Sequence, residues 1–479
     1  MTGIDEWDAR WRALVFPPDH RNPMPAPRYN LVVIGAGPAG LITSIAAAGL
    51  GAKVALVERH AMGGDCLNVW CVPSKTLLAA ASAGLDFGAA MERVHAVRAQ
   101  IAEHDSVERY SKAGVDVFLG EASFAAPGEI RVADARLRTR KTVIATGARA
   151  ALPPVPGLAE IEPLTNETVF DLRSQPKRLA ILGAGPVGCE LAQAFARLGT
   201  RVEVVEAQSR ALQGDEAEAA ACVVGALRRE GVRFHFDAKV TGVSRTPAGK
   251  VLTLSDGSGV EADEILVAAG RRRNLESLGL ERVGVKFDPR AGIEVDERLR
   301  TSAAGVFAVG DVCSRLQFTH NADAQARIVI RNALFAGRAR TDRLFIPWAT
   351  YTKPEVAHVG VTRGQLESAG RPFEAFRVGF GELDRGRTDD GADGYAEVLV
   401  ARGTDRILGA TIVGKDAGEQ LAPIVVMMQN GLGLGTLASV VLPYPTRSEY
   451  LRRLADAWNR TRLTPFAAKA LRWWLDRTR

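Results

Sequence analysis

Cysteine is scarce in this 479-residue sequence, which has five cysteines spread along the chain. So few cysteines over this length exclude the disulfide framework of small secreted domains. Long apolar runs are also missing, because no uncharged apolar stretch reaches the roughly 18 residues of a membrane span. The first residues lack the basic region and apolar stretch of a secretory signal. These absences predict a cytoplasmic globular protein, and the length predicts about three domains.

A basic surface across the body of the protein is missing as well. The formal net charge is +6, and the segment 451–479 alone holds eight basic and two acidic residues. The rest of the chain is therefore close to neutral. A nucleic-acid groove would need basic residues distributed over one face, so the sequence predicts no nucleic-acid partner.

Two segments repeat the pattern of an apolar strand, a glycine-rich turn, an Ala-rich helix and a second strand. They are 29–60, "YNLVVIGAGPAGLITSIAAAGLGAKVALVERH", and 178–210, "RLAILGAGPVGCELAQAFARLGTRVEVVEAQSR". Each pattern predicts a βαβ unit. The sequence thus predicts an α/β fold with two Rossmann-like domains.

Each βαβ unit contains G-x-G-x-x-G followed by an acidic residue at the end of the second strand. The glycines permit a tight turn and close approach to a pyrophosphate, and the carboxylate accepts from ribose hydroxyls. A single copy could be a simple packing turn, but two copies with the same spacing predict two dinucleotide sites. The candidate residues are Gly35, Gly37, Gly40 and Glu58 in the first copy, and Gly183, Gly185, Gly188 and Glu206 in the second.

Two dinucleotides in one chain favour electron transfer from a nicotinamide to a flavin. Glu206 at the ribose would repel a 2′-phosphate, which favours NADH over NADPH. Arg210 lies close enough in sequence to keep NADPH as the alternative.

The stretch "GGDCLNVWCVPSK" places Cys66 and Cys71 five positions apart. Residues i and i+5 of a regular helix lie too far apart for a disulfide, so a bridge would need an irregular helix start. A helix N-terminus would lower the pKa of a thiol there. Two ordinary buried cysteines are the alternative. The C-x4-C spacing is unlike a zinc site, and no metal site is predicted.

The residues from about Arg28 to Leu454 resemble the pyridine nucleotide-disulfide oxidoreductases. These flavoenzymes include dihydrolipoamide dehydrogenase, glutathione reductase and mercuric reductase. The resemblance is carried, in order, by "GAGPAG", "GGDCLNVWCVPSK", "IATGA", "GAGPVGCE", "AAGRRRN", "GVFAVGDV", "THNADAQAR", "PWATYTKPEVAHVG" and "YPTRSE".

The resemblance implies two dinucleotide-binding domains and a C-terminal α+β dimerisation domain, arranged as an obligate homodimer. The C-terminal motif of one chain would complete the active site of the other. The expected divisions are an N-terminal arm (1–27), a FAD-binding domain (28–156 and 276–343), an NAD(P)H-binding domain (157–275), a dimerisation domain (344–460) and a basic amphipathic tail (461–479).

The resemblance also assigns roles to single residues. FAD would lie along the first glycine turn and NADH along the second. Cys71 would be the thiol nearest the flavin, and Cys66 would meet the substrate. Lys75 and Glu190 match an ion pair beside the flavin ring, and Asp311 would contact the flavin chain. Further cofactor-binding candidates in the matching motifs are Thr146, Gly147 and Gly270.

The C-terminal motif departs from the disulfide-reducing members, which have His-Pro-Thr and a Glu five residues after the His. Here Tyr444 replaces the His, and Glu449 is retained. A tyrosine with a pKa near 10 exchanges protons poorly with a thiol at neutral pH. This favours a mercuric reductase-like enzyme with a small-molecule or metal-ion acceptor, although the further C-terminal cysteine pair of those enzymes is missing. Dihydrolipoamide dehydrogenase and a flavin-bound redox sensor or membrane-associated scaffold are the alternatives.

Trp70 is a second departure, because the family has glycine before the flavin-proximal cysteine. Its indole could pack outward against protein, or it could line and narrow the substrate entrance.

Five of the seven tryptophans lie near the two ends of the chain. Trp7, Trp11 and Leu14 follow helical spacing, and "TPFAAKALRWWLDRTR" predicts a capped amphipathic helix. Both helices could dock on the dimer. The alternative is peripheral membrane contact through the basic C-terminal tail.

Overall fold

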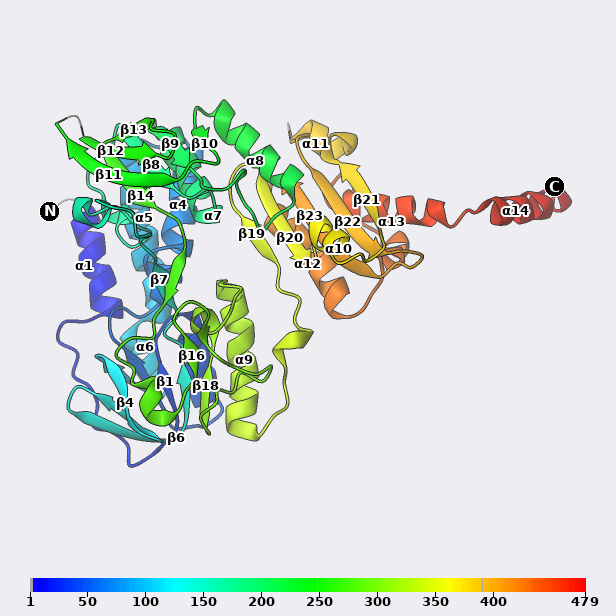
Figure 1. Cartoon of the computed structure of the whole chain (residues 1–479). Coiled ribbons are helices and arrows are strands. Elements are labelled where there is room, and N and C mark those ends of the chain that lie inside the picture. The colour runs from blue at the N-terminus through cyan, green and yellow to red at the C-terminus, as the bar shows by residue number, and fades with distance from the viewer. Residues whose placement is uncertain (1–2, 248, 390) are drawn as a thin grey trace. The chain divides into compact units, whose positions relative to one another are not determined.

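The α/β class expected from the sequence is confirmed in a computed structural model, which describes residues 3–247, 249–389 and 391–479 (Figure 1). The chain divides into two compact units. The first unit comprises 1–209 and 231–344, and the second comprises 210–230 and 345–479.

The first βαβ pattern forms the centre of a seven-stranded sheet in the first unit. β1 pairs in parallel with β2 on one side and β6 on the other, and β18 also joins β6 in parallel. The strand order is β3-β2-β1-β6-β5-β4, with bounds β1 Tyr29–Ile34, β2 Val54–Glu58, β3 Val115–Leu119, β4 Ala122–Ala126, β5 Glu129–Val132, β6 Ala135–Ile144 and β18 Val306–Ala308.

The central strands of this sheet carry apolar side chains that are buried on both faces, as in a parallel sheet that is covered by helices. Leu31, Val32 and Val33 of β1 are fully buried. The helices in the chain segments between and after these strands are α2 (Pro38–Gly49), α3 (Gly64–Asn68), α4 (Cys71–Ser82), α5 (Phe87–Ile101), α6 (Val107–Lys112) and α9 (Thr319–Phe335), with the 3-10 turns Ala102–Asp105 and Gly310–Val312. Of these helices, α2 and α6 contact strands of the sheet directly, and α4 packs against α5.

The second βαβ pattern forms a four-stranded parallel sheet in the same unit, beside a three-stranded antiparallel sheet. α7 (Pro186–Arg197) follows the glycine turn. The strands are β8 Arg178–Leu182, β9 Arg201–Val205, β10 Arg233–His235 and β14 Glu264–Val267 in the first sheet, and β11 Val240–Thr246, β12 Gly249–Leu254 and β13 Gly259–Ala262 in the second.

Short paired strands and 3-10 turns complete the first unit. β7 pairs with β15 and β16 pairs with β17, both antiparallel. Their bounds are β7 Ala148–Ala150, β15 Arg271–Arg273, β16 Phe287–Asp288 and β17 Gly292–Ile293, and the 3-10 turns are Ala159–Ile161, Val169–Asp171, Leu280–Val283 and Thr341–Arg343.

The second unit is an antiparallel sheet of order β19-β20-β23-β22-β21. Its core contains fully buried Phe380 and Tyr450. The strands are β19 Trp348–Thr350, β20 Glu355–Gly360, β21 Phe373–Gly379, β22 Tyr395–Ala401 and β23 Ile407–Gly414. The helices are α8 Ala217–Arg229, α10 Arg363–Ser368, α11 Asp384–Thr388, α12 Ala417–Gln429, α13 Glu449–Thr461 and α14 Pro465–Arg477, with 3-10 turns Phe380–Glu382 and Leu434–Ser439.

α8 follows the second βαβ pattern in sequence, yet it groups with the second unit. The indole nitrogen of Trp348 donates to Asp215 Oδ1 at 2.8 Å, just before α8. Arg377 forms an ion pair with Glu218 on α8 at 2.6 Å. These contacts attach residues 210–230 to the C-terminal sheet.

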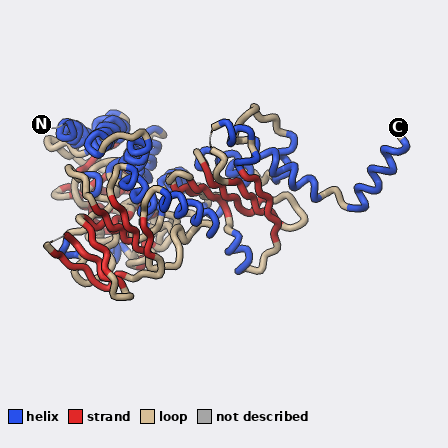
Figure 2. The backbone as a smooth tube through the Cα atoms, turned by 90° about the horizontal axis from the view of Figure 1, so that it is seen from above, coloured by secondary structure: helices blue, strands red, loops and turns tan. Residues whose placement is uncertain are grey.

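The two terminal helices differ in what they contact. α1 (Gly3–Val15) packs against α5 (Figure 1). Its last residue, Val15, is fully buried. α14 begins with the Thr464 cap expected from the sequence, but none of its described residues is buried. Both views show α14 apart from the sheet of its own unit (Figure 2). Among the described residues, no helix has the length and apolar character to cross a membrane.

Candidate active site

The first glycine turn joins β1 to α2 and has the geometry of a close backbone crossing. Gly35 has φ of +104°, a left-handed value that glycine adopts without strain. A Cβ on Gly40 would lie 1.8 Å from the backbone oxygen of Gly35. Glycine at these two positions therefore lets the start of α2 approach the end of β1. Gly37 is the N-cap of α2.

Glu58 at the end of β2 holds the glycine turn in place. Its carboxylate accepts from the backbone N–H of Ala36 at 2.7 Å and of His60 at 2.8 Å. Burial raises the pKa of Glu58, and the two amides oppose this effect. The carboxylate is thus held beside the turn, where a ribose could donate to it.

The second glycine turn repeats this geometry within the same unit. Gly183 has φ of +103°, and a Cβ on Gly188 would lie 1.9 Å from the oxygen of Gly183. Gly185 is the N-cap of α7. Glu206 accepts from Ala184 N–H at 2.8 Å and from Gln208 N–H at 2.9 Å. The two copies therefore share both their spacing and their hydrogen bonds.

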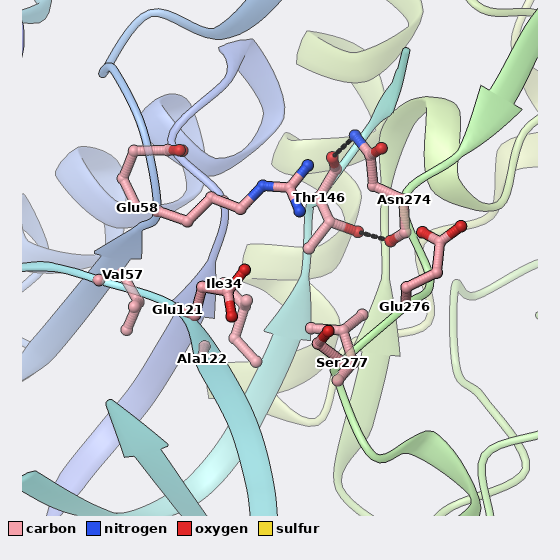
Figure 3. A pocket seen from close by; sticks show the side chains of 13 residues that line it. Ile34, Val57, Glu58, Glu121, Ala122, Thr146, Asn274, Glu276 and Ser277 are labelled. Atoms are coloured by element: carbon pink, nitrogen blue, oxygen red, sulfur yellow. Dashed lines mark hydrogen bonds between the residues drawn. The ribbon is translucent and has the colours of Figure 1, made fainter. Parts of the chain in front are cut away.

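A pocket opens beside the first glycine turn (Figure 3). Gly35, Glu58 and Thr146 line it together with Asn274. Thr146 Oγ1 donates to the backbone oxygen of Asn274 at 2.7 Å. In return, the side-chain amide of Asn274 donates to the backbone oxygen of Thr146 at 2.8 Å. The glycine turn at Gly35 and Gly40 leaves no room for a Cβ, and the Glu58 carboxylate is fixed beside it. Together they fit the adenosine half of a dinucleotide such as FAD.

Two further cofactor-binding candidates in the first unit are glycines with a left-handed backbone conformation. Gly147 has φ of +67° and Gly270 has φ of +130°. The backbone N–H of Asn274 donates to the Gly147 oxygen at 3.0 Å. Both glycines therefore border the segments that meet at Thr146 and Asn274.

Asp311 lies in the 3-10 turn after β18 and faces Arg271. The Arg271 Nη2 to Asp311 Oδ2 distance is 3.5 Å, and the same guanidinium bonds Asp65 next to Cys66. Burial raises the pKa of Asp311, and Arg271 opposes this effect. Sequence reasoning missed Arg271, although it lies in the "AAGRRRN" motif directly after Gly270.

The helix carrying the two cysteines is interrupted between them, as a disulfide would require. Cys66 lies on α3, α3 ends at Asn68, and α4 begins at Cys71. Trp70 between the helices has φ −145° and ψ −83°, which are not helical values. The two thiols lie within hydrogen-bond reach of each other, and both are free.

Cys71 is the acidic member of the pair. The hydrogen bond from Cys66 is the strongest influence and lowers the pKa of Cys71 to about 6, against the effect of burial. Thr319 and Lys75 lower it further, and the Cys71 Sγ to Thr319 Oγ1 distance is 3.4 Å. The hydrogen bond to Cys71 raises the pKa of Cys66, and burial adds to it. The arrangement therefore stabilises a thiolate on Cys71.

Lys75 connects the dithiol helix to the second βαβ pattern. Its Nζ lies 2.7 Å from Glu190 Oε2 on α7, and Glu190 is 1% exposed. The Trp70 ring centroid lies 4.8 Å from the same Nζ. The half-buried indole thus contacts a lysine that is paired with a buried carboxylate, which the sequence did not predict.

Tyr444 and Glu449 belong to the second unit. Tyr444 is 71% exposed and donates to Asp384 Oδ2 at 2.5 Å. This hydrogen bond raises the pKa of Tyr444 further above neutrality. Glu449 is the first residue of α13 and pairs with Arg453 at 2.7 Å. The phenol is therefore a poor proton acceptor at neutral pH.

A resident metal ion needs a cluster of ligating side chains. Over 3–247, 249–389 and 391–479, the structure contains no group of three or more His, Cys, Asp or Glu side chains placed to hold a metal ion.

Two family models match the chain and together cover most of it. Residues 29–326 match the model described as pyridine nucleotide-disulphide oxidoreductase. Residues 346–455 match the dimerisation domain of the same family, which supports a homodimer.

Full-length relatives carry several different names. A mercuric reductase of Streptomyces lividans is 33% identical over 456 residues, covering 90% of this chain and 96% of that protein. A dihydrolipoyl dehydrogenase of Thermus scotoductus is 35% identical over 452 residues, covering 90% and 97%. The solved Cu(II) complex of RclA, an HOCl-induced flavoprotein disulfide reductase from Escherichia coli, has a TM-score of 0.84 at 29% identity and covers 90% of this chain and 100% of that one.

Proposed function

Because the chain belongs to the pyridine nucleotide-disulphide oxidoreductases, which are FAD- and NAD(P)-dependent enzymes, we propose that it oxidises NADH and reduces a thiol-reactive acceptor through Cys66 and Cys71. The observation that carries the proposal is the acidic Cys71 at the start of α4, hydrogen-bonded to Cys66 across a break in the helix. An ordinary pair of buried thiols would not favour a thiolate at neutral pH.

The first glycine turn, with Glu58 and Asp311, would hold FAD, and the second turn with Glu206 would hold the nicotinamide dinucleotide. Bound FAD would supply the transfer of an electron pair from the nicotinamide to the Cys66–Cys71 disulfide. Reduction of that disulfide by the electron pair and one proton breaks the S–S bond, protonates Cys66 and leaves Cys71 as a thiolate, and Cys66 gives up its proton when the acceptor is reduced. Cys66 then meets the acceptor, the acceptor takes two electrons, and the disulfide forms again.

NADH is preferred over NADPH for two reasons. Glu206 is fixed at the turn by two backbone amides, where its charge would repel a 2′-phosphate. The Arg210 guanidinium donates to the backbone oxygens of 211, 212, 213 and 215. An arginine bound within its own loop is less suited to recognise a phosphate.

We propose an acceptor that needs thiol ligands more than a proton shuttle, as in mercuric reductase-type enzymes. Tyr444 stands where a histidine base would serve dihydrolipoamide, and its hydrogen bond to Asp384 makes it less acidic still. Trp70 would narrow the approach to Cys71. The second candidate is a dihydrolipoamide dehydrogenase, and the candidate from another class is a flavin-bound redox sensor or membrane-associated scaffold.

We further propose that α14 contacts an anionic membrane surface. Trp473 and Trp474 are 54% and 60% exposed, and Phe466 is 83% exposed. Arg472 lies on the side of the helix away from Trp474, and the Arg477 guanidinium carbon lies 3.9 Å from the centroid of the Trp473 ring. Exposed indoles beside basic residues suit the boundary of anionic headgroups.

The redox function is tested by anaerobic titration of the purified flavoenzyme with NADH. A long-wavelength band from the Cys71 thiolate to the flavin is expected, and Cys71→Ser should abolish it while the flavin remains bound. A wild-type enzyme that is colourless and cannot be reconstituted with FAD, or a band unchanged by Cys71→Ser, would contradict the proposal. Steady-state NADH consumption with Hg(II), lipoamide, quinones and oxygen then separates the candidates, and failure with every acceptor favours the sensor.

A further inference from the structure

The N-terminal helix α1 lies before the residues that match the family model, which begin at 29. It nevertheless contacts the segment that carries the dithiol. The backbone N–H of Met62 donates to the Val15 oxygen at 3.1 Å, at the end of α1. Trp11 and Leu14 pack against the hydrophobic core of the first unit. An element outside the matched domain is thus built into the surroundings of Cys66.

Trp11 makes a specific polar contact with α3. Its indole N–H donates to the side-chain oxygen of Asn68 at 2.8 Å. Asn68 is the last residue of α3 and is 7% exposed. The Asn68 amide donates in turn to the Met62 oxygen at 3.1 Å. Trp11 therefore holds Asn68 in place, at the point where α3 ends before the break that precedes α4.

Arg98 on α5 completes the connection between α1 and α3. Its guanidinium carbon lies 4.6 Å from the centroid of the Trp11 ring. Its Nη2 donates to Asp8 Oδ1 at 2.7 Å, and its Nη1 donates to the Asn68 backbone oxygen at 3.3 Å. His95 and Arg173 also bond Asp8. These contacts fix α1 against α5 at the point where Trp11 reaches Asn68.

α3 has only five residues, and a helix of one turn or so is not stable by itself in water. The position of Cys66 therefore depends on what packs against α3. Cys71 lies on a different and longer helix, α4. The separation of the two sulfurs is consequently sensitive to the contacts at Asn68.

We propose that α1 positions the interchange thiol, and that Trp11 is a positioning residue that keeps Cys66 within bonding reach of Cys71. The inference rests on the proposed redox function of the pair. A looser α3 would separate the thiols, so the disulfide would become less favourable to form and Cys66 would react more readily with external reagents. A helix that only adds buried surface would change neither property.

The test measures the thiol–disulfide equilibrium of the holoenzyme in dithiothreitol buffers, with alkylation and mass spectrometry to count each cysteine. Trp11→Phe keeps the ring near Arg98 but removes the N–H donor. Losing a net hydrogen bond should shift the equilibrium constant toward the dithiol by about five-fold. Alkylation of Cys66 in the reduced enzyme should accelerate by a similar factor. Trp7→Phe is the matched control on the same helix, and it should leave both readouts at the wild-type value.

An unchanged equilibrium constant and an unchanged Cys66 alkylation rate in Trp11→Phe, with or without a lower melting temperature, would overturn the inference. If Trp11→Phe does not fold, Asp8→Asn weakens the attachment of α1 to Arg98 and should shift the same two readouts in the same direction. A wild-type enzyme that forms no Cys66–Cys71 disulfide at any thiol ratio would instead refute the proposed function. That result is distinct from a normal wild-type equilibrium that the variants leave unchanged.

Discussion

At the scale of single residues, the acidity of Cys71 arises from three neighbours, two of them on other helices and one on its own helix. Cys66 on α3 and Thr319 at the start of α9 hydrogen-bond its sulfur, and Lys75 one turn later on α4 supplies positive charge. Each neighbour favours the thiolate over the thiol. Burial alone would have the opposite effect.

The rate of Cys71 alkylation in the reduced enzyme should therefore rise between pH 5 and 7 and level off above that range, because the thiolate is the reactive form and the pKa of Cys71 is about 6. Thr319→Val removes one hydrogen bond to the sulfur and should move the midpoint to higher pH. Thr319→Ser keeps the hydroxyl and is the control. Rate measurements by mass spectrometry from pH 4.5 to 9 test this, and equal midpoints for the valine variant and the wild type would contradict it.

Residue-level prediction from the sequence works where spacing along the chain is informative. The acidic residue 23 positions after the first glycine identifies Glu58 and Glu206, and both carboxylates bond the glycine turns in the structure. Spacing carries no information about Thr319 or Arg271, which reach the dithiol segment from distant parts of the chain. Such contacts arise from tertiary packing, so no local sequence pattern predicts them.

At the scale of elements, the ion pair between Lys75 and Glu190 joins α4 to α7. Glu190 is almost completely buried, whereas the Lys75 side chain is 30% exposed. A buried carboxylate without its partner is destabilising, because its desolvation is no longer compensated. The pair therefore connects the dithiol helix to the helix that follows the second glycine turn.

Lys75→Met should lower the free energy of unfolding by about 2 kcal/mol, a value between those of exposed and fully buried ion pairs, because Lys75 is partly exposed. The double variant Lys75→Met/Glu190→Gln should recover part of that loss, since the uncompensated charge is removed. Urea denaturation of the holoenzymes measures both changes. A single variant as stable as the wild type would show that the pair does not hold the two helices together.

The irregular junction between α3 and α4 shows how far element boundaries could be predicted. A Cys66–Cys71 bridge needs an irregular helix start, as the spacing of the two cysteines indicates, and the helix is broken at Val69 and Trp70. The anchoring of α1 could not be predicted in detail. Its helical spacing of tryptophans was visible, but the partner Asn68 lies 57 residues away.

At the scale of the whole molecule, the second unit has two parts with different surfaces. The sheet and α13 form a buried core, and the match to the family's dimerisation domain covers the sheet and the first half of α13. α14 follows as a helix without a buried residue among those described. The sequence predicted the helix from its cap and periodicity, but amphipathicity alone does not specify whether protein or lipid covers the apolar face.

Truncation after Arg462 tests which surface α14 contacts. The full chain should float with vesicles that contain phosphatidylserine and stay unbound with pure phosphatidylcholine, and the truncated chain should bind neither. Each basic residue near an anionic surface contributes about 1 kcal/mol, so binding should weaken as salt is raised. Trp473→Ala/Trp474→Ala keeps the charge and separates the contribution of the indoles. Equal flotation of full-length and truncated protein would exclude the membrane role, and a change of oligomeric state on truncation would show that α14 packs on the partner chain.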